Sequence, residues 1–185
     1  MTTNLKLDRI KVPSGEITNS PLLLEMAKRN VPVILSTGMC DLSDIEEALS
    51  VLAFGYLNLD EKPSPAAFRR ALTSNEGYNL LKKNVIILQC TSDYPAKATE
   101  LNLRAIETIR SAFLLPVGFS DHSESDWAAV AAVALGACCI EKHFTTDKNL
   151  PGPDHKASLS PTELTDFVFK IRETEKSLGT GRKVP

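Results

Sequence analysis

The chain has 185 residues, of which 43% are hydrophobic and 24% are charged, and its formal net charge is −2. This length suits one globular domain, and the near-neutral charge excludes the basic surface with which proteins bind nucleic acid or anionic membranes. No apolar run approaches the roughly 18 residues of a membrane-spanning helix, and the N-terminus has no apolar signal core, so we expect a cytoplasmic protein.

Five short apolar runs, each ending in a polar cluster, predict β-strands that are buried on both faces. In chain order they are residues 9–12, 33–35, 85–88, 116–119 and 137–140. Apolar residues at helical spacing predict a helix after each strand. These helices are residues 21–30, 43–51, 101–113, 127–135 and a last helix after residue 160.

Capping residues indicate where two of these helices begin. Ser43 and Glu46 have the spacing of a capping box, and Ser160 followed by Pro161 marks the start of the last helix, which Gly179 ends. Residues 55–84 break the alternation and contain a weak helix near residues 66–73. We interpret them as an insertion on the outer or lower side of the sheet; a substrate lid is the alternative.

The cysteines give no sign of a metal or disulfide framework, because none has CxxC spacing. Cys138 and Cys139 are adjacent in the last predicted strand, where neighbouring side chains point to opposite faces. We therefore expect them to be reduced thiols packed as small hydrophobic residues on the two faces.

Alternating strands and helices predict a parallel α/β protein. An open doubly wound sheet gathers its chemistry at one switch point, whereas a (β/α)₈ barrel gathers it from the carboxyl ends of many strands. All five predicted strands end in hydroxyls, charges or histidines, which favours the barrel. We predict a partial (β/α)₈ TIM barrel of about five βα units, in a single domain over residues 1–185.

His122 and His143 end consecutive predicted strands, so their imidazoles would lie side by side at the barrel mouth. Neutral imidazole is a common ligand of divalent metals, and water or substrate oxygens would complete the coordination. The alternative is that both histidines only hydrogen-bond to neighbouring loops.

A set of donors also recurs at the strand ends and would suit an anion such as phosphate. It consists of Lys11, Ser14, Ser36, Thr37, Ser92 and Ser120. Glu16 and Glu141 are the nearest carboxylates, and Glu16 is placed to act as an acid or base, although a surface salt bridge is the alternative for either. Asp154 lies in a proline-rich loop that would hold it over the mouth, unless that loop is only a turn.

Six blocks of the sequence, in order, resemble the N-acetylneuraminate (sialic acid) synthase family, with its legionaminate and pseudaminate synthases. The blocks are KVPSGE (11–16), LSTGM (35–39), CTSDYP (90–95), GFSDH (118–122), IEKHF (140–144) and PGPD (151–154). The resemblance implies a transferase that joins phosphoenolpyruvate to N-acetylmannosamine or a related N-acetylated amino sugar. Water is consumed and phosphate released, with a divalent metal, Mn²⁺ or else Mg²⁺, at the barrel mouth.

The resemblance also implies a role for individual residues. His122 and His143 match the metal ligands, and Glu16 matches an acidic residue beside the reacting carbons. The residues that match substrate contacts are Lys11, Ser14, Ser36 and Ser120 for phosphoenolpyruvate, and Tyr94 and Asp154 for the sugar. Ser92 departs from the asparagine of some members, which puts its own contact in doubt.

Full-length members of that family are homodimers with three earlier strands and a C-terminal antifreeze-like domain. This chain contains neither part, so we expect a truncated protein that is inactive or nearly so alone. We also expect its open barrel edges to favour association.

Three other functions stay open at this point. A Schiff-base aldolase would use Lys11 or Lys142 at a strand end. A Kdo-8-phosphate-synthase-like enzyme would need additional basic residues for its phosphorylated acceptor, and a non-catalytic anion-binding remnant would bind phosphoenolpyruvate without a metal. The sequence does not distinguish between the possible acceptor sugars.

Overall fold

The computed structural model describes residues 7–183, so residues 1–6 and 184–185 of the predicted domain lie outside the described residues. The chain divides into two compact units. The first contains residues 7–88 with 112–116, and the second contains residues 89–111 with 117–183.

The strand pairs β1–β2, β2–β3 and β4–β5 are parallel, and the order in the sheet, β1-β2-β3-β4-β5, is the order along the chain. The strands are β1 (Ile10–Val12), β2 (Val33–Ser36), β3 (Val85–Cys90), β4 (Val117–Asp121) and β5 (Ile140–Lys142). A doubly wound sheet reverses its strand order at a switch point, whereas a barrel does not. The unreversed order confirms the partial (β/α)₈ barrel.

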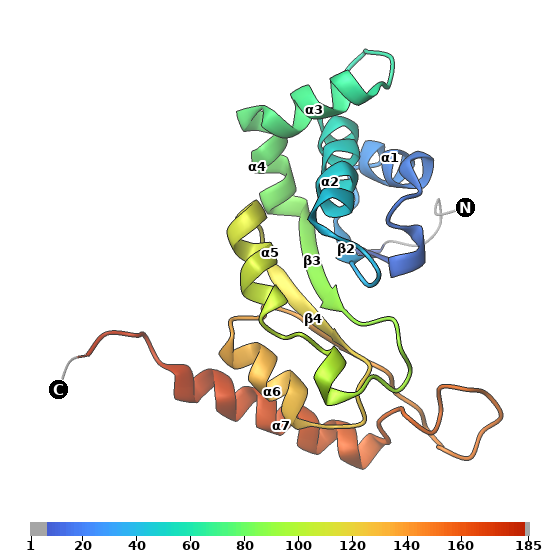
Figure 1. The fold of residues 1–185 in the computed structure, drawn as a ribbon, viewed down its shortest axis with the longest axis vertical. Helices are drawn as coiled ribbons and strands as arrows, with labels where there is room; N and C mark the ends of the chain where they lie inside the picture. Colours follow the sequence, from blue (N-terminus) through green and yellow to red (C-terminus); the bar gives the residue numbers. More distant parts are fainter. Residues whose placement is uncertain (1–6, 184–185) are drawn as a thin grey trace. The chain divides into compact units, whose positions relative to one another are not determined.

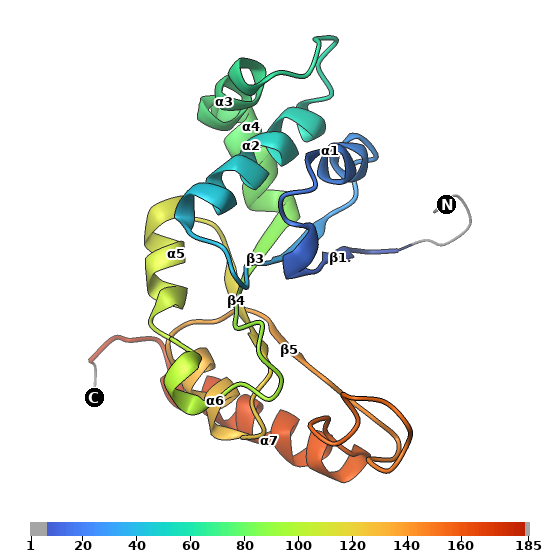
Figure 2. The same ribbon diagram turned by 45° about the vertical axis from the view of Figure 1, so that its right-hand side comes forward.

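Helices α1 (Ser20–Lys28) and α2 (Leu42–Leu57) pack against each other in the first unit, shown in blue and cyan in Figures 1 and 2. The two helices can lie this close because residue 55 is a glycine. A Cβ atom at Gly55 would lie 2.5 Å from Cβ of Ala27 and would clash with it. The prediction that the second helix ends at residue 51 and that residue 55 opens an insertion is therefore wrong. The helix continues to Leu57 and buries this glycine against α1.

The insertion forms two helices, α3 (Pro65–Thr73) and α4 (Asn75–Asn84), and both pack on α2. Figure 1 shows that α4 leads directly into the start of β3. The insertion thus lies at the amino end of that strand, as the insertion interpretation predicts, and α4 is a helix that the sequence analysis missed. Its N-cap is Ser74, whose hydroxyl accepts from the amide of Gly77.

The first turn of α2 also differs from the prediction. Asp41 caps the helix, accepting from the amides of Ser43 and Asp44, and Asp44 returns a bond to the Asp41 amide. The capping box therefore joins Asp41 and Asp44 rather than Ser43 and Glu46. The carboxylate of Asp41, two residues earlier, outcompetes the Ser43 hydroxyl because it accepts two backbone hydrogen bonds.

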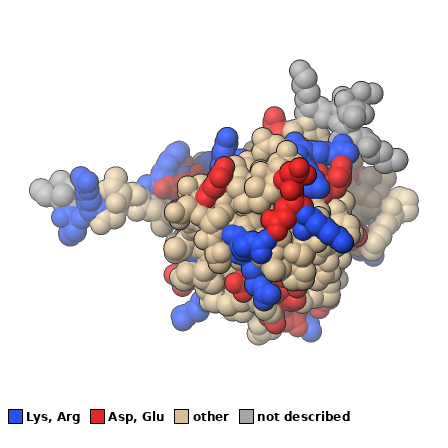
Figure 3. Space-filling model, turned by 90° about the horizontal axis from the view of Figure 1, so that it is seen from above, with Lys and Arg blue, Asp and Glu red and all other residues tan. Residues whose placement is uncertain are grey.

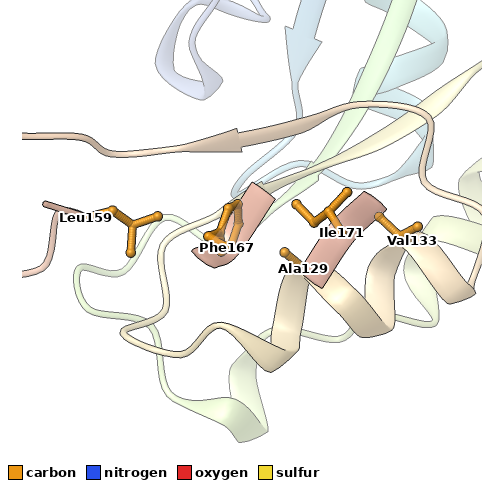
Figure 4. Close-up of a cluster of buried hydrophobic side chains, with 5 residues drawn as sticks. All are labelled: Ala129, Val133, Leu159, Phe167 and Ile171. Atoms are coloured by element: carbon orange, nitrogen blue, oxygen red, sulfur yellow. The ribbon is translucent and has the colours of Figure 1, made fainter. Parts of the chain in front are cut away.

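In the second unit, β4 and β5 are followed by α6 (Trp127–Ala134) and α7 (Pro161–Leu178), with α5 (Ala105–Phe113) preceding β4. Helices α6 and α7 pack together around a cluster of buried apolar side chains, drawn in Figure 4. The cluster consists of Ala129, Val133, Leu159, Phe167 and Ile171. The predicted Ser160 cap, Pro161 start and Gly179 end of α7 are all confirmed.

The predicted strand over residues 137–140 begins later, at Ile140. Residues 137–139 precede this strand, and there the Cys138 amide donates to the carbonyl of Val117 while the Cys139 carbonyl accepts from the amide of Phe119. Cys138 is exposed and Cys139 is half-buried instead of lying on two buried faces. The structure has all four cysteines as thiols, as expected.

Acidic and basic side chains are interspersed on the face shown in Figure 3, and several of opposite charge lie next to each other. This agrees with the small net charge of the chain. Among residues 7–183, no helix is both long and apolar enough to span a bilayer.

Candidate functional site

Strands β4 and β5 separate two sets of polar side chains. Ser120 lies opposite Glu141 in the register, and Asp121 lies opposite Lys142. Successive strand side chains point to opposite faces, so each pair occupies its own face. The contacts follow this division: the Ser120 hydroxyl donates to Oε1 of Glu141 at 2.7 Å, and Nζ of Lys142 lies 3.1 Å from Oδ2 of Asp121.

His122 follows β4 directly and is only 9% exposed. Its Nδ1 lies 2.5 Å from the carbonyl oxygen of Thr91. Its Nε2 lies 2.7 Å from the hydroxyl of Tyr94 and 3.1 Å from that of Ser120. The thiol of Cys90 is 4.0 Å from both ring nitrogens. The end of β3 and the loop after it therefore enclose the imidazole at the end of β4.

These contacts fix which nitrogen of His122 carries a hydrogen. A carbonyl oxygen can only accept, so Nδ1 donates to Thr91. Burial lowers the pKa of His122 from its usual value, and the neighbouring His143 acts in the same direction. The bond to Thr91 and two nearby carboxylates oppose this shift. The neutral ring keeps a lone pair on Nε2, which suits a hydrogen-bond donor or a metal ion.

Tyr94 lies against both histidines. Its ring stacks on His122 with centroids 3.9 Å apart, and its centroid is 5.0 Å from that of His143. Desolvation raises the pKa of Tyr94 to about 12, and the charges of Cys90, Asp154 and Glu141 add to the shift. Tyr94 is therefore a hydroxyl donor at neutral pH, and the exposed Asp154 acts on it electrostatically.

The loop that carries Asp154 is held in place by its neighbours. The Ser158 hydroxyl donates to the backbone carbonyl of Asp154 at 2.7 Å. The third histidine, His155, has Nδ1 2.7 Å from the hydroxyl of Thr145, which is 4% exposed. These contacts tie the loop to Thr145 and within itself, and the placement of Asp154 over the barrel mouth stays a prediction.

Lys142 is engaged in a way that does not suit a Schiff-base nucleophile. Its side chain is only 4% exposed, pairs with Asp121 and donates to the carbonyl of Ser123. An amine that forms an imine must reach its substrate with a lone pair. The ion pair holds Lys142 on the face opposite Glu141, so the structure argues against an aldolase that uses this lysine.

In the first unit, contacts join the ends of β1 and β2. The Ser14 hydroxyl, in the 3₁₀ turn after β1, accepts from the amide of Gly38 at 2.9 Å. Glu16 lies in the same turn and accepts from the side chain of Asn19, the N-cap of α1. Lys11 is half-buried in β1, and its Nζ lies 3.4 Å from the carbonyl of Val12. Glu16 is therefore held at a helix start, and it forms no salt bridge with another residue in the range 7–183.

Ser36 is the last residue of β2 and is only 2% exposed. Its hydroxyl has no hydrogen-bond partner among the described residues. The adjacent Thr37, by contrast, donates its hydroxyl to the carbonyl of Leu88 at 2.8 Å. Burying a hydroxyl without a partner costs about 1–3 kcal/mol, so Ser36 is a candidate for a contact outside the chain.

His122 and His143 are the residues of the second unit that could bind a metal ion. The centroids of His122 and His143 are 5.8 Å apart. In residues 7–183 no group of three or more His, Cys, Asp or Glu side chains is close enough to hold an ion. The two imidazoles fit an ion that completes its coordination with water or substrate oxygens, as a catalytic ion does.

Comparison with known proteins gives this geometry its context. The model described as the NeuB family matches residues 1–183. The chain belongs to the NeuB family. This NeuB family member is 45% identical to N,N'-diacetyllegionaminic acid synthase of Campylobacter jejuni over 99% of this chain and 48% of the relative. It is 43% identical to the synthase of the same name from Legionella pneumophila, over 98% of this chain and 45% of the relative.

The fold is also similar to that of a solved structure. N-acetylneuraminic acid synthetase from Leptospira borgpetersenii is 33% identical, with a TM-score of 0.77 over 97% of this chain and 54% of that one. The NeuB family member described here thus spans about half the length of the curated relatives it matches.

The predicted site residues of this NeuB family member fall into the two units. In the second unit, direct contacts join His122 to Tyr94 and Ser120, and His143 lies beside them. Ser92 is exposed, and no hydrogen bond joins its side chain to another described residue. In the first unit Ser14 contacts Gly38, Glu16 is bound by Asn19, Lys11 lies near the Val12 carbonyl, and the Ser36 hydroxyl has no partner among residues 7–183.

Thr91 is a site residue that the sequence analysis missed. It acts through its backbone carbonyl, which any amino acid supplies, so no signal in the sequence could reveal it. The Asp121–Lys142 pair was missed too, although strand alternation predicts that these residues share a face.

Proposed function

We propose that the protein is a nonulosonic acid synthase, a transferase that joins phosphoenolpyruvate to N-acetylmannosamine or a related N-acetylated amino sugar. The observation that carries the proposal is the buried, neutral His122, whose Nε2 is directed at Tyr94 and Ser120 in a chain of the NeuB family. The curated relatives, named as diacetyllegionaminic acid synthases, support this class of product.

The proposed reaction forms one carbon–carbon bond. C3 of phosphoenolpyruvate attacks the aldehyde carbon of the open-chain sugar, and the aldehyde oxygen takes up a proton. Water adds at C2, and cleavage of the C2–O bond then releases inorganic phosphate and leaves the 2-keto acid. The protein must therefore hold two substrates and supply and remove protons at known atoms.

In the second unit, His122 and His143 would hold a divalent ion, Mn²⁺ or else Mg²⁺. Such an ion would supply Lewis-acid polarisation of the aldehyde oxygen. Tyr94 is a neutral donor and would hydrogen-bond the sugar, with Asp154 accepting from its hydroxyls. Ser92 is exposed at the same loop and would contact the same substrate.

In the first unit, Lys11, Ser14 and Ser36 would bind the anionic groups of phosphoenolpyruvate, as Ser120 would in the second. The unpartnered hydroxyl of Ser36 supports this role, because a substrate oxygen would satisfy it. Glu16 would act as acid or base, since its carboxylate is held by Asn19 in one orientation. A cytoplasmic location and a homodimer complete the proposal.

Phosphate release from phosphoenolpyruvate tests the proposal. The chain is incubated with Mn²⁺ and a panel of N-acetylated hexosamines, and inorganic phosphate is measured. Because the chain is expected to be nearly inactive alone, we expect weak release with one sugar, and a fall to background in His122→Ala. His155→Asn is the control, because its amide can still donate to Thr145 and the remaining histidines are unchanged.

Binding of phosphoenolpyruvate is measured in parallel by ligand-observed NMR. Lys11→Ala should weaken binding by about tenfold or more, because a bond between charged groups contributes about 1.5–3 kcal/mol. If the chain neither binds phosphoenolpyruvate nor releases phosphate, the proposal is wrong. Binding without release, and without any effect of Mn²⁺, would instead identify a non-catalytic anion-binding protein.

A further inference from the structure

The hydroxyl of Tyr94 occupies the ring nitrogen of His122 that a metal would need. It lies 2.7 Å from Nε2, while Nδ1 on the other side of the ring is engaged by the Thr91 carbonyl. The two rings are stacked with an interplanar angle of 26°, so the tyrosine covers the face of the imidazole as well. His122 therefore has one usable lone pair, and Tyr94 is already bonded to it.

The hydrogens around Nε2 identify Tyr94 as the donor. Ser120 is also close, at 3.1 Å, but it has a single hydrogen and donates it to Glu141 at 2.7 Å. A bond to a carboxylate is stronger than one to a neutral nitrogen, so Ser120 keeps this orientation. The Cys90 sulfur is 4.0 Å away and is a weak donor. Among residues 7–183, only the Tyr94 hydroxyl offers Nε2 a short, strong hydrogen bond.

A lone pair accepts a hydrogen bond or coordinates an ion, but it cannot do both. We propose that Tyr94 competes with the metal for His122, so that an ion binds only after the tyrosine hydroxyl leaves Nε2. This inference rests on the proposed metal site at His122 and His143. Tyr94 is 46% exposed, so it has room to rotate away from the imidazole.

The competition also links the two ligands of the proposed reaction. While it is bonded to His122, the Tyr94 hydroxyl has already donated its hydrogen and cannot donate it to a sugar. Arrival of the ion releases this hydroxyl at the position where the amino sugar is proposed to bind. Metal binding and sugar binding therefore favour each other, because both require the same movement of Tyr94.

Metal affinity measures the competition directly. Mn²⁺ is titrated into the 185-residue chain, and the unbound ion is followed by its electron paramagnetic resonance signal. Tyr94→Phe keeps the ring and removes the hydroxyl, so we expect it to bind Mn²⁺ about two- to tenfold more tightly, the range that one neutral hydrogen bond contributes. His122→Ala should abolish binding.

Tyr78→Phe is the matched control, since it also removes one tyrosine hydroxyl. That hydroxyl donates to the carbonyls of Phe113 and Leu114, so its loss should leave the Mn²⁺ affinity unchanged. Equal affinities for the wild type and Tyr94→Phe, with binding still lost in His122→Ala, would overturn the competition and leave the metal site standing. If no variant binds Mn²⁺ at millimolar concentration, or if His122→Ala binds normally, both proposals fail.

A second measurement needs no metal. In long-range ¹H–¹⁵N spectra of the metal-free protein, His122 should show a protonated Nδ1 and a hydrogen-bonded, unprotonated Nε2. Tyr94→Phe should shift the Nε2 resonance toward that of an unbonded nitrogen and leave Nδ1 unchanged. An Nε2 resonance that is the same in both proteins would contradict the bond on which the competition depends.

Discussion

Asp121 and Lys142 form an ion pair in which the side chains are 0% and 4% exposed. Oδ1 of Asp121 accepts from the amide and hydroxyl of Ser123, and Lys142 donates to the Ser123 carbonyl. Oδ2 of Asp121 lies 3.1 Å from Nζ but outside hydrogen-bond geometry, so the contact there is attraction between charges. The pair thus ties β5 to the residue that follows His122.

Lys142→Met should destabilise the protein strongly, because it leaves the Asp121 carboxylate buried without its counter-charge. The free energy of unfolding should fall by about 3–5 kcal/mol, as measured by urea denaturation followed by circular dichroism. Lys170→Met is the control, since Lys170 pairs with Asp126 and Asp166 at the surface, where salt bridges contribute little. Equal losses in the two variants would show that the burial of the pair has no energetic consequence.

At the level of helices and strands, the sequence predicts what depends on local chemistry. The bounds of α7 follow from residue types that can be read in the sequence: Ser160 as the N-cap, Pro161 at the start and Gly179 at the end. The end of α2 cannot be predicted in this way. Gly55 lies inside the helix because only a glycine leaves room there for Ala27, which belongs to another helix. Similarly, α4 has few apolar residues and is stabilised by packing on α2, which no local pattern reveals.

The first turn of α7 should respond to acid through Glu163. Hydrogen bonds from Lys148 and then from Ser160 lower the pKa of Glu163 to about 2. A lowered folded-state pKa adds stability that is present above the ordinary pKa and is lost as the pH falls through the folded value. Between about pH 4.5 and pH 2, the protection of the Leu164 amide from hydrogen exchange should therefore decrease.

Glu163→Gln should remove this dependence on pH, because glutamine can still complete the capping box but has no charge for Lys148. Glu175→Gln is the control, since it removes an exposed carboxylate that pairs with Arg172 near the other end of α7. Identical pH profiles for the wild type and Glu163→Gln would contradict the assigned cause of the shift.

On the scale of the whole molecule, the strand order of the described residues places β1 and β5 at the two ends of the sheet. End strands present backbone groups to which another chain can pair. Beside β5, a groove of about 350 Å³ is lined by residues that include Cys138, Ile140, Phe167 and Val168. The barrel class could be predicted from the repeated polar strand ends. This groove, whose lining also includes Lys142, Arg172 and Glu175, depends on how α7 packs and could not be predicted.

We expect the chain to associate through this groove at micromolar concentrations, as measured by analytical ultracentrifugation. Cys138→Asp should weaken the association about tenfold or more, because a charged carboxylate would have to lose its water on entering the interface. Ser177→Asp adds the same charge at the exposed end of α7 and should have no effect. A monomer at all concentrations would contradict the expectation.

The pairing of Ser120 with Glu141 and of Asp121 with Lys142 also fixes how β4 and β5 align as the chain folds. A slip of one residue exchanges the two faces of a strand. It would bring the Lys142 ammonium toward Ser120 and turn the Glu141 carboxylate onto the face of Asp121, where like charges would meet. A shifted register would therefore lose favourable contacts on both faces of the strand pair. The polar side chains of the site thus favour the native register of β4 and β5 as the chain folds.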